Sequence, residues 1–524
     1  MEFINHWAIL AVAVFAYFAT LVFYRLFLDP LARFPGPKLA AISRWYEAYY
    51  DVVLGGKYTF KIAQLHKEYG PIIRISPYEL HVSDPAFFDT IYRMTGRWDK
   101  YSWAADAFGM RGSTVFASDH HLHKIRRRAI APFFSKSHVY ARQDFLRRNV
   151  DKLCQRISSL DGDTVNLGAA MSAFARDVAN EFILGKYYNE LGLDDFGIGM
   201  AIVNQGSGII WRTTKHCRWF GRLMIAIPTD LMMRVADDNM KAFIRFGKQF
   251  KRDTREALEA VTPSSLLYSD DSDSSGDSVP VNTNMVHYIA NSNLPPAEKE
   301  LDRVIQEFGA TLGAAYETTA STLRLVLYHV YSNPDILQRL RREFDDAFTI
   351  VLNYRAVPIT FRTDDLKQLE KLPYLRAVLT EGMRLSPGNC TRMARVTDKD
   401  LFYHEWCIPA GTPVGMTTIL LHTDEDAYPD PMRFNPDRWL AESKTEGAED
   451  EARVYAPFSR GTRICLGIHL AWAEMYSVLS ALVQGYDCTF PDATATDFEG
   501  MSDNFSIGTK AGPNLHAHVT VRTR

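Results

Sequence analysis

The chain opens with a long run of apolar residues. Residues 7–24 read WAILAVAVFAYFATLVFY and contain no charged side chain. A helix of about 20 apolar residues crosses the core of a bilayer, so the run predicts a membrane-spanning segment. Glu2 precedes the run and Arg25 follows it, which favours a cytosolic location for the rest of the chain. A cleaved signal peptide is the alternative, but such peptides have a shorter apolar core that follows positive charge.

Beyond this run the pattern becomes that of a globular body. The sequence Phe34-Pro-Gly-Pro37 stops any helix and predicts a stiff hinge. We therefore divide the chain into a membrane anchor (1–28), a proline-rich hinge with the start of the catalytic body (29–57), and a main domain (58–524).

Within the main domain, short alternating runs such as residues 72–75 predict strands, whereas long helical patterns dominate after about Asp119. Residues 263–284 are rich in Ser and Asp and have few side chains to bury, which predicts an acidic surface loop. A linker between domains is the alternative. Because candidate functional residues lie on both sides of it, we favour one large, mostly α domain with small β-sheets.

Composition narrows the possible functions. The 59 basic and 62 acidic residues among 524 give a net charge of −3, so no basic excess indicates nucleic-acid binding. No two cysteines form a C-x-x-C pair, which argues against a zinc ribbon and a disulfide framework. We expect most of the cysteines to be buried free thiols. The six are Cys154, Cys217, Cys390, Cys407, Cys465 and Cys488.

Cys465 has unusual surroundings in the sequence. It belongs to the stretch FSRGTRICLG, residues 458–467, which a helical pattern follows. We expect Gly461 to allow a tight turn and Gly467 to let a flat group approach. Helix N-termini and nearby cations such as Arg463 favour a thiolate, the form in which sulfur binds metals.

This stretch resembles the heme-binding signature of the cytochrome P450 family, with Phe458, Gly461, Arg463, Cys465 and Gly467 at the matching positions. The resemblance implies the P450 fold, a single large heme domain, and heme b as cofactor. Cys465 would be the axial ligand of the heme iron. Phe458, Arg463 and Gly467 would contact the cofactor.

A second match is Glu381-Gly-Met-Arg384, in a helical pattern where positions i and i+3 share a face. It is followed by FNPDRW, residues 434–439, which resembles another conserved region of the family. The resemblance implies that Glu381, Arg384 and Arg438 form a structural ion network.

A third match lies in a helix predicted from about Glu298 to Val330. The stretch AAYETT, residues 314–319, resembles the oxygen-activation motif of the family. The resemblance assigns proton delivery to Glu317 and Thr318, while an ordinary capped or surface Glu–Thr pair is the alternative. Ala315 stands where the family usually has glycine.

The stretch HHLHKIRRR, residues 120–128, takes the place of a Trp-x-x-x-Arg helix in the family. His123 would replace the tryptophan, and Arg127 would match the arginine. Both would donate to the heme propionates, as would Arg395, which follows Ala394 where proline is common. The other cations, Lys124, Arg126 and Arg128, are expected to face solvent, where they could dock a reductase.

The resemblance implies an oxidoreductase, a monooxygenase of the endoplasmic reticulum membrane with its catalytic domain in the cytosol. Electrons would come from NADPH–cytochrome P450 reductase, with cytochrome b5 as a further donor. A Met-rich segment, residues 223–233, is expected to contact membrane lipid and gate substrate access, with ordinary core packing as the alternative. Substrate-pocket residues implied by position are Phe108, Phe308, Thr311, Ala314 and Phe505.

The run from Glu381 to Val396 resembles enzymes of filamentous fungi that act on terpenoid, notably trichothecene-type, or polyketide skeletons. We expect hydroxylation or epoxidation of such an apolar molecule. A heme-thiolate isomerase or dehydratase that needs no reductase, a non-catalytic heme sensor or electron carrier, and a protein without heme are the alternatives.

Overall fold

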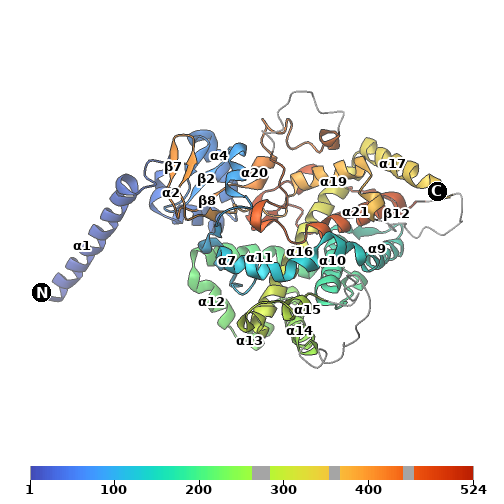
Figure 1. The fold of residues 1–524 in the computed structure, drawn as a ribbon, viewed down its shortest axis with the longest axis horizontal. Coiled ribbons are helices and arrows are strands. Elements are labelled where there is room, and N and C mark those ends of the chain that lie inside the picture. Colours follow the sequence, from blue (N-terminus) through green and yellow to red (C-terminus); the bar gives the residue numbers. More distant parts are fainter. Residues whose placement is uncertain (1, 262–283, 353–365, 441–453, 523–524) are drawn as a thin grey trace.

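The computed structural model describes residues 2–261, 284–352, 366–440 and 454–522. Nearly all of the predicted acidic loop at 263–284 lies outside these residues. The N-terminal helix α1 (Glu2–Phe23) continues into a π-helical turn (Tyr24–Leu28) and projects from the body (Figure 1). Its apolar span, His6–Leu28, has a mean hydropathy of 2.1 and no buried residue. Length and composition make it a candidate membrane anchor, as predicted.

The principal sheet lies beside the anchor and has the strand order β1-β2-β8-β5-β3 (Figure 1). All residues of β1 and β2 are buried, which explains the continuous apolar pattern at 72–73. In the antiparallel pair of β3 and β5, Lys100 lies opposite Arg395. The strands are β1 (Ile72–Arg74), β2 (Leu80–Val82), β3 (Asp99–Lys100), β5 (Arg395–Val396) and β8 (Val414–Gly415).

The rest of the body is mostly helical and is organised around α16 (Leu301–Tyr331). This helix packs against α10 (Leu167–Ala179), α14 (Asp238–Ala260), α19 (Pro373–Leu385) and α21 (Ile468–Gly485). Every residue of α10 is buried, which accounts for its run of small and apolar side chains. The predicted P450-type architecture, mostly α with small sheets, is confirmed.

Several shorter elements complete the body. The remaining helices are α2 (Lys38–Ile42), α3 (Trp45–Ala48), α4 (Tyr58–Tyr69), α5 (Phe88–Ile91), α6 (Ser102–Ala105), α7 (His120–Ile130), α8 (Lys136–Ala141), α9 (Gln143–Ser158), α11 (Ile198–His216), α12 (Arg218–Ala226), α13 (Thr229–Val235), α15 (Met285–Ala290), α17 (Pro334–Leu352), α18 (Leu366–Leu369) and α20 (Thr418–His422). The remaining strands are β4 (Thr164–Asn166), β6 (Leu401–Tyr403), β7 (Trp406–Ile408), β9 (Tyr486–Thr489), β10 (Ser502–Asn504), β11 (Ser506–Gly508) and β12 (His516–Val521).

The hairpin of β10 and β11 turns at a single residue, Phe505. Its φ is +73°, a value that is rare for a bulky side chain. The backbone N–H of Phe505 donates to Asp503 Oδ1 at 2.9 Å, and its carbonyl accepts from the N–H of Cys390 at 2.9 Å. These bonds hold the strained turn against the segment that follows α19.

Candidate functional site

Cys465 lies in a tight turn that leads into α21. Its N–H donates to the carbonyl of Phe458 at 2.9 Å, which closes the turn. Gly461 has a φ of +75°, and a Cβ there would lie 2.7 Å from the carbonyl oxygen of Arg93, so only glycine fits. Gly467 is the N-cap of α21, and a Cβ on it would meet no atom within 4 Å. The turn, the helix start and the open space beside Gly467 agree with the sequence pattern.

Among the six cysteines, all within the described parts of the chain, Cys465 alone is exposed. Even so, desolvation by surrounding protein raises the pKa of its thiol, while the N–H of Gly467 and the charge of Arg127 act in the opposite direction. The helix start and a neighbouring cation therefore favour the thiolate, as expected, but desolvation outweighs them. Coordination to a metal ion deprotonates a thiol outright. A metal ion bound at this position would therefore stabilise the thiolate, which the protein alone does not.

The central helix α16 also borders a space that side chains do not fill. Gly313 and Ala314 are exposed halfway along this otherwise largely buried helix, and a Cβ on Gly313 would meet nothing within 4 Å. The hydroxyl of Thr318 donates to the carbonyl of Ala314 at 2.8 Å. A Cβ on Gly388, after α19, would lie 3.1 Å from Cγ2 of Thr318. Thr318 thus lies between the exposed helical turn and the segment after α19.

Glu317 is held by other partners. Its Oε2 accepts from Arg324 Nη2 at 2.9 Å and from Gln205 Nε2, in α11, at 3.4 Å. Arg324 is buried and also donates to Ser172 Oγ at 2.9 Å. Glu317 therefore sits in a buried ion pair, and its contacts differ from those of Thr318. The ordinary surface pair considered above is excluded, because Glu317 is 8% exposed.

Basic side chains gather beside the cysteine turn. They are Lys100, His123, Arg127, Arg395 and Arg463, from β3, α7, β5 and the cysteine turn. Desolvation, followed by the four neighbouring cations, lowers the pKa of His123 to about 2. Burial and the charges of Arg463, Arg395 and Arg127 hold the pKa of Lys100 well below its usual value.

The polar groups of this cluster fit an anionic ligand. Among the described residues, Arg395 Nη2 and Arg463 Nε are buried without a hydrogen-bond partner. Like charges placed opposite each other on paired strands, as Lys100 and Arg395 are, destabilise a sheet. The cluster lies close enough to Cys465 for Arg127 to influence the thiol. Two carboxylates beside the sulfur, such as the propionates of heme, would satisfy these groups.

Lys100 was missed by the sequence reasoning because only the register of β3 with β5 brings it into the cluster. The expectation that Arg126 faces solvent is wrong. Its guanidinium is buried and pairs with Glu298, with 2.7 Å between Nε and Oε2. Lys124 and Arg128 are exposed, as expected.

Glu381, Arg384 and Arg438 come together as the sequence implied. Arg384 donates twice to the Glu381 carboxylate, at 2.8 and 2.9 Å, and both residues are completely buried. Arg438 Nε lies 3.4 Å from Glu381 Oε1. The carboxylate also accepts from the N–H of Asn435 and from Trp439 Nε1, both at 2.9 Å.

His422 connects this network to the cysteine turn. The carbonyl of His422 accepts from Arg384 Nη1 at 2.7 Å, and its Nδ1 lies 3.0 Å from the carbonyl of Arg384. Its Nε2 accepts from the N–H of Ala456 at 2.9 Å, two residues before Phe458. Both contacts are satisfied by the neutral ring, and burial lowers its pKa to about 3.

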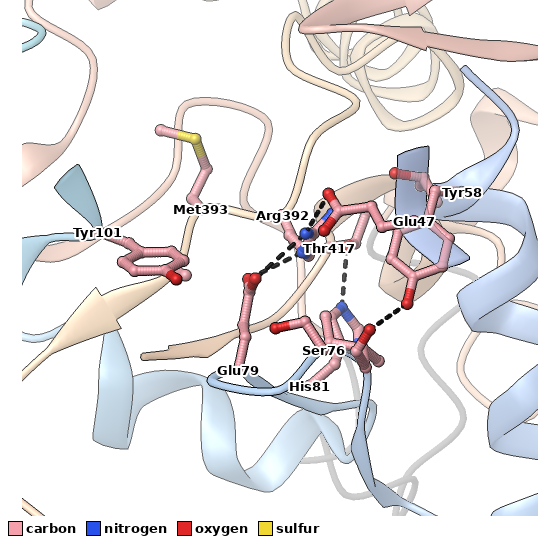
Figure 2. Close-up of polar contacts among 12 residues, drawn as sticks. Glu47, Tyr58, Ser76, Glu79, His81, Tyr101, Arg392, Met393 and Thr417 are labelled. Atoms are coloured by element: carbon pink, nitrogen blue, oxygen red, sulfur yellow. Dashed lines mark hydrogen bonds and ion pairs between the residues drawn. The ribbon is translucent and has the colours of Figure 1, made fainter. Parts of the chain in front are cut away.

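A small recess of about 40 Å³ adjoins the cationic cluster and shares Lys100 and Arg395 with it. Its other lining residues are Tyr101, Ala104, Ala105, Phe116, Trp211, Thr391, Arg392, Met393, Ala394 and Phe505. Figure 2 shows Arg392 held by Glu47 and Glu79; its Nη2 lies 2.7 Å from Glu47, and its Nε lies 2.8 Å from Glu79. Arg392 is therefore neutralised within the protein.

Of the predicted pocket residues, Phe505 lines this recess. Phe108 packs against Phe505, with the two ring centroids 4.9 Å apart. Ala314 is exposed on α16. The prediction for Phe308 is wrong, because its side chain is completely buried in the main hydrophobic core. The hydroxyl of Thr311 donates to the carbonyl of Glu307 at 2.7 Å, and Thr311 does not line the recess.

Comparison with known proteins identifies relatives along almost the whole chain. The sequence model of the family described as Cytochrome P450 matches residues 48–515. N-acetyltryptophan 6-hydroxylase ivoC of Emericella nidulans is 34% identical over 97% of this chain and 95% of its own length. Cytochrome P450 monooxygenase tpcC of Cochliobolus heterostrophus is 36% identical over 90% of this chain and 86% of its own. Tryptophan 6-hydroxylase fscE of Fusarium equiseti is 34% identical over 94% of this chain and 92% of its own length.

The cationic cluster predicts that one substitution will raise the stability of the heme-free protein and weaken heme retention. Lys100→Met should stabilise the protein freed of heme, because it removes one of several crowded positive charges. It should speed heme loss by about ten- to a hundredfold, since a charge-assisted hydrogen bond contributes about 1.5–3 kcal/mol. Thermal unfolding of the heme-free protein and transfer of heme to an excess of apomyoglobin measure the two effects.

Lys67→Met, which changes an exposed lysine on α4, is the matched control and should alter neither quantity. A Lys100→Met protein that is less stable without heme, and that retains heme normally, would contradict the prediction.

Proposed function

We propose that this chain, which belongs to the cytochrome P450 family, is a membrane-anchored monooxygenase that hydroxylates or epoxidises an apolar metabolite. Members of the family are oxygen-incorporating oxidoreductases with cysteine-ligated heme b. Electrons would come from NADPH–cytochrome P450 reductase, with cytochrome b5 as a further donor. The observation that carries the proposal is Cys465, exposed at the start of α21 beside a cationic cluster with unpartnered buried donors.

We assign the heme contacts from the positions of the side chains. Cys465 would ligate the heme iron, and Lys100, His123, Arg127 and Arg395 would hold the propionates. When bound, the heme supplies the activation of dioxygen. Gly467 leaves the space beside the sulfur open, and Phe458 closes the turn that presents it.

Arg463 has a further role in this arrangement. Its guanidinium donates to the carbonyl groups of Ala117, Ser118 and Asp119. It thereby joins the cysteine turn to the segment that precedes α7. Its buried Nε is free to face an anion.

Proton delivery is assigned to Thr318 and Glu317. The Thr318 hydroxyl, on the α16 turn next to exposed Ala314, can hold a proton donor over the open space. Glu317 has a buried, unpartnered Oε1, whereas Oε2 is held by Arg324. Arg324 and Gln205 therefore fix the direction in which this carboxyl group can accept or release a proton.

Apolar side chains outside α1 support contact with membrane lipid. Trp219 and Leu223 on α12, and Leu231 and Val235 on α13, are 51–76% exposed. With the anchor, they favour a single-pass protein of the endoplasmic reticulum membrane. The exposed cations Lys124 and Arg128 are candidate contacts for an acidic reductase.

A terpenoid or polyketide intermediate of fungal secondary metabolism is the proposed substrate. A tryptophan-type aromatic substrate is a second candidate, favoured by Tyr101, Phe116, Trp211 and Phe505 in the recess wall and by the names of two relatives. Incubation with each precursor under labelled dioxygen separates a monooxygenase from a heme-thiolate isomerase or dehydratase, whose product would contain no labelled oxygen. The comparisons with hydroxylases speak against a sensor or electron carrier.

The ligand assignment predicts the effect of Cys465→Ser. The reduced native protein should give the carbon monoxide absorption band of a thiolate-ligated heme, and the variant should lose it because sulfur is replaced by oxygen. Cys217→Ser, at a half-buried cysteine, is the control and should retain the band. Retention of the band in Cys465→Ser would identify another ligand.

The assignment of Thr318 predicts uncoupling in Thr318→Ala. NADPH should still be consumed, but the yield of product per NADPH should fall by at least tenfold, with hydrogen peroxide accounting for the difference. Thr496→Ala, at an exposed threonine, is the control. Unchanged coupling in Thr318→Ala would remove this residue from proton delivery.

The anchor assignment predicts that a chain of residues 29–524 sediments less with membranes than the full chain. The exposed residues of α12 and α13 should retain part of it on the membrane until Trp219 and Leu223 are changed to Ser. Full membrane association of the truncated chain with these two substitutions would contradict both assignments.

A further inference from the structure

Four aromatic side chains pack together at the recess and are here called the aromatic quartet. Phe116, Trp211 and Phe505 line the recess, and Phe108 packs against all three. The Phe108 centroid lies 4.6 Å from Phe116, 5.8 Å from Trp211 and 4.9 Å from Phe505, and the Trp211–Phe505 separation is 5.5 Å. The Phe108 ring is roughly parallel to those of Phe116 and Trp211 and perpendicular to that of Phe505. Within the quartet, rings therefore meet both face to face and edge to face.

The quartet is held in place by polar contacts made outside the rings. Trp211 Nε1 donates to the carbonyl of Ala104 at 3.1 Å, and Lys215 Nζ lies 4.5 Å from the Trp211 ring centroid. Lys215 is in turn buried with Glu47 and Asp51, which fixes this end of α11. The indole plane therefore has little freedom to rotate away.

The segment that carries Phe116 is fixed in a similar way. The buried carboxylate of Glu307 accepts from the Thr114 hydroxyl at 2.8 Å and from its N–H at 3.1 Å. Arg303 pairs with the same carboxylate and neutralises it. Two residues beyond Thr114, the Phe116 ring is thus positioned from α16.

Phe505 is the member held under strain. Its positive φ is maintained by its own backbone contacts with Asp503 and Cys390. The Asp503 carboxylate is fixed by Thr59 Oγ1 at 2.8 Å, and its carbonyl accepts from Arg212 Nη1 at 3.0 Å. A strained backbone that its surroundings over-determine marks a functional position. Here it presents an aromatic side chain at the recess.

Apart from the hydroxyl of Thr391, the remaining polar groups of the recess wall offer little to a neutral ligand. Arg392 is neutralised by Glu47 and Glu79, and the hydroxyl of Tyr101 accepts from Arg44. Lys100 and Arg395 belong to the cluster assigned to the propionates. The surface left for substrate is therefore formed largely by rings, with Ala104, Ala105 and Met393 between them.

We propose that this recess selects substrates with a planar aromatic ring over saturated polycyclic ones, and that Phe505 and Phe108 determine this specificity. The inference rests on the proposed function, because it takes the recess as the substrate site. Of the candidate substrates named there, it favours the aromatic ones over a terpenoid. A ring that stacks on or meets the edge of the quartet gains affinity beyond its buried area, whereas a puckered saturated skeleton of similar size does not.

Naphthalene and decalin test the inference, because they share one carbon skeleton and differ in aromaticity and planarity. Dissociation constants are measured with the heme-loaded full chain by the absorbance change of the heme and by calorimetry. The native protein should bind naphthalene more tightly than decalin, although decalin is the more apolar of the two. Phe505→Leu and Phe108→Leu should each lower this preference by about two- to tenfold.

Phe402→Leu, which changes a side chain that is 68% exposed on β6, should leave the preference unchanged. Thermal unfolding and heme content show whether each variant is folded, and two separate quartet variants keep the test valid if one fails to fold. A native preference for decalin, or a preference unaffected in the folded quartet variants, would overturn the inference.

The same preparations separate this outcome from failure of the proposed function. If the protein gives the thiolate-type carbon monoxide band and prefers decalin, only the aromatic inference is contradicted. If the band is absent, the proposed function is contradicted, and the inference that rests on it fails as well. Indole and 2-naphthol, as further ligands, distinguish a nitrogen heteroaromatic substrate from an aromatic polyketide, and tighter binding of either one supports the inference.

Discussion

The site depends on positive charge that the protein gathers but does not neutralise. Lys100, Arg127, Arg395 and Arg463 converge from four segments, together with the neutral ring of His123. Two buried nitrogen atoms of the cluster have no partner among the described residues. Burying unpaired charge is costly, so this arrangement is favourable only when an anion joins it. The paired strands β3 and β5, helix α7 and the cysteine turn are consequently held together best in the presence of the cofactor. Heme binding and the final packing of this region are thermodynamically linked.

The other side of the cysteine turn is stabilised within the protein itself. Glu381 receives donors from Arg384, Asn435 and Trp439, so its buried charge is satisfied before any cofactor arrives. Breaking such a pair costs about 3–5 kcal/mol because the remaining charge stays buried. Through His422, this network reaches the backbone just before the turn. One flank of the turn is therefore preformed, while the other is completed by the ligand.

Local sequence patterns were sufficient for much of this architecture. The uncharged run before Arg25 predicted α1, and the spacing from Phe458 to Gly467 predicted a turn that leads into a helix. Contacts between distant segments were not predictable in the same way. Lys100 enters the cluster through strand register, Arg126 is buried because Glu298 reaches it, and Phe308 turns into the core because of how α16 is rotated. These outcomes depend on packing, which a motif of ten residues does not encode.

At the hairpin tip, the backbone of residue 505 and its side chain are under different constraints. The bonds that hold the tip use the backbone of residue 505 and the side chain of Asp503, and none requires a phenyl ring. Evolution can therefore exchange the side chain at this position while the hairpin and its attachment to Cys390 persist. Glycine at this position would adopt the positive φ without strain, whereas most other residues would be strained as phenylalanine is. Related enzymes could in this way diversify their chemistry through one projecting residue, with the scaffold around the heme left intact.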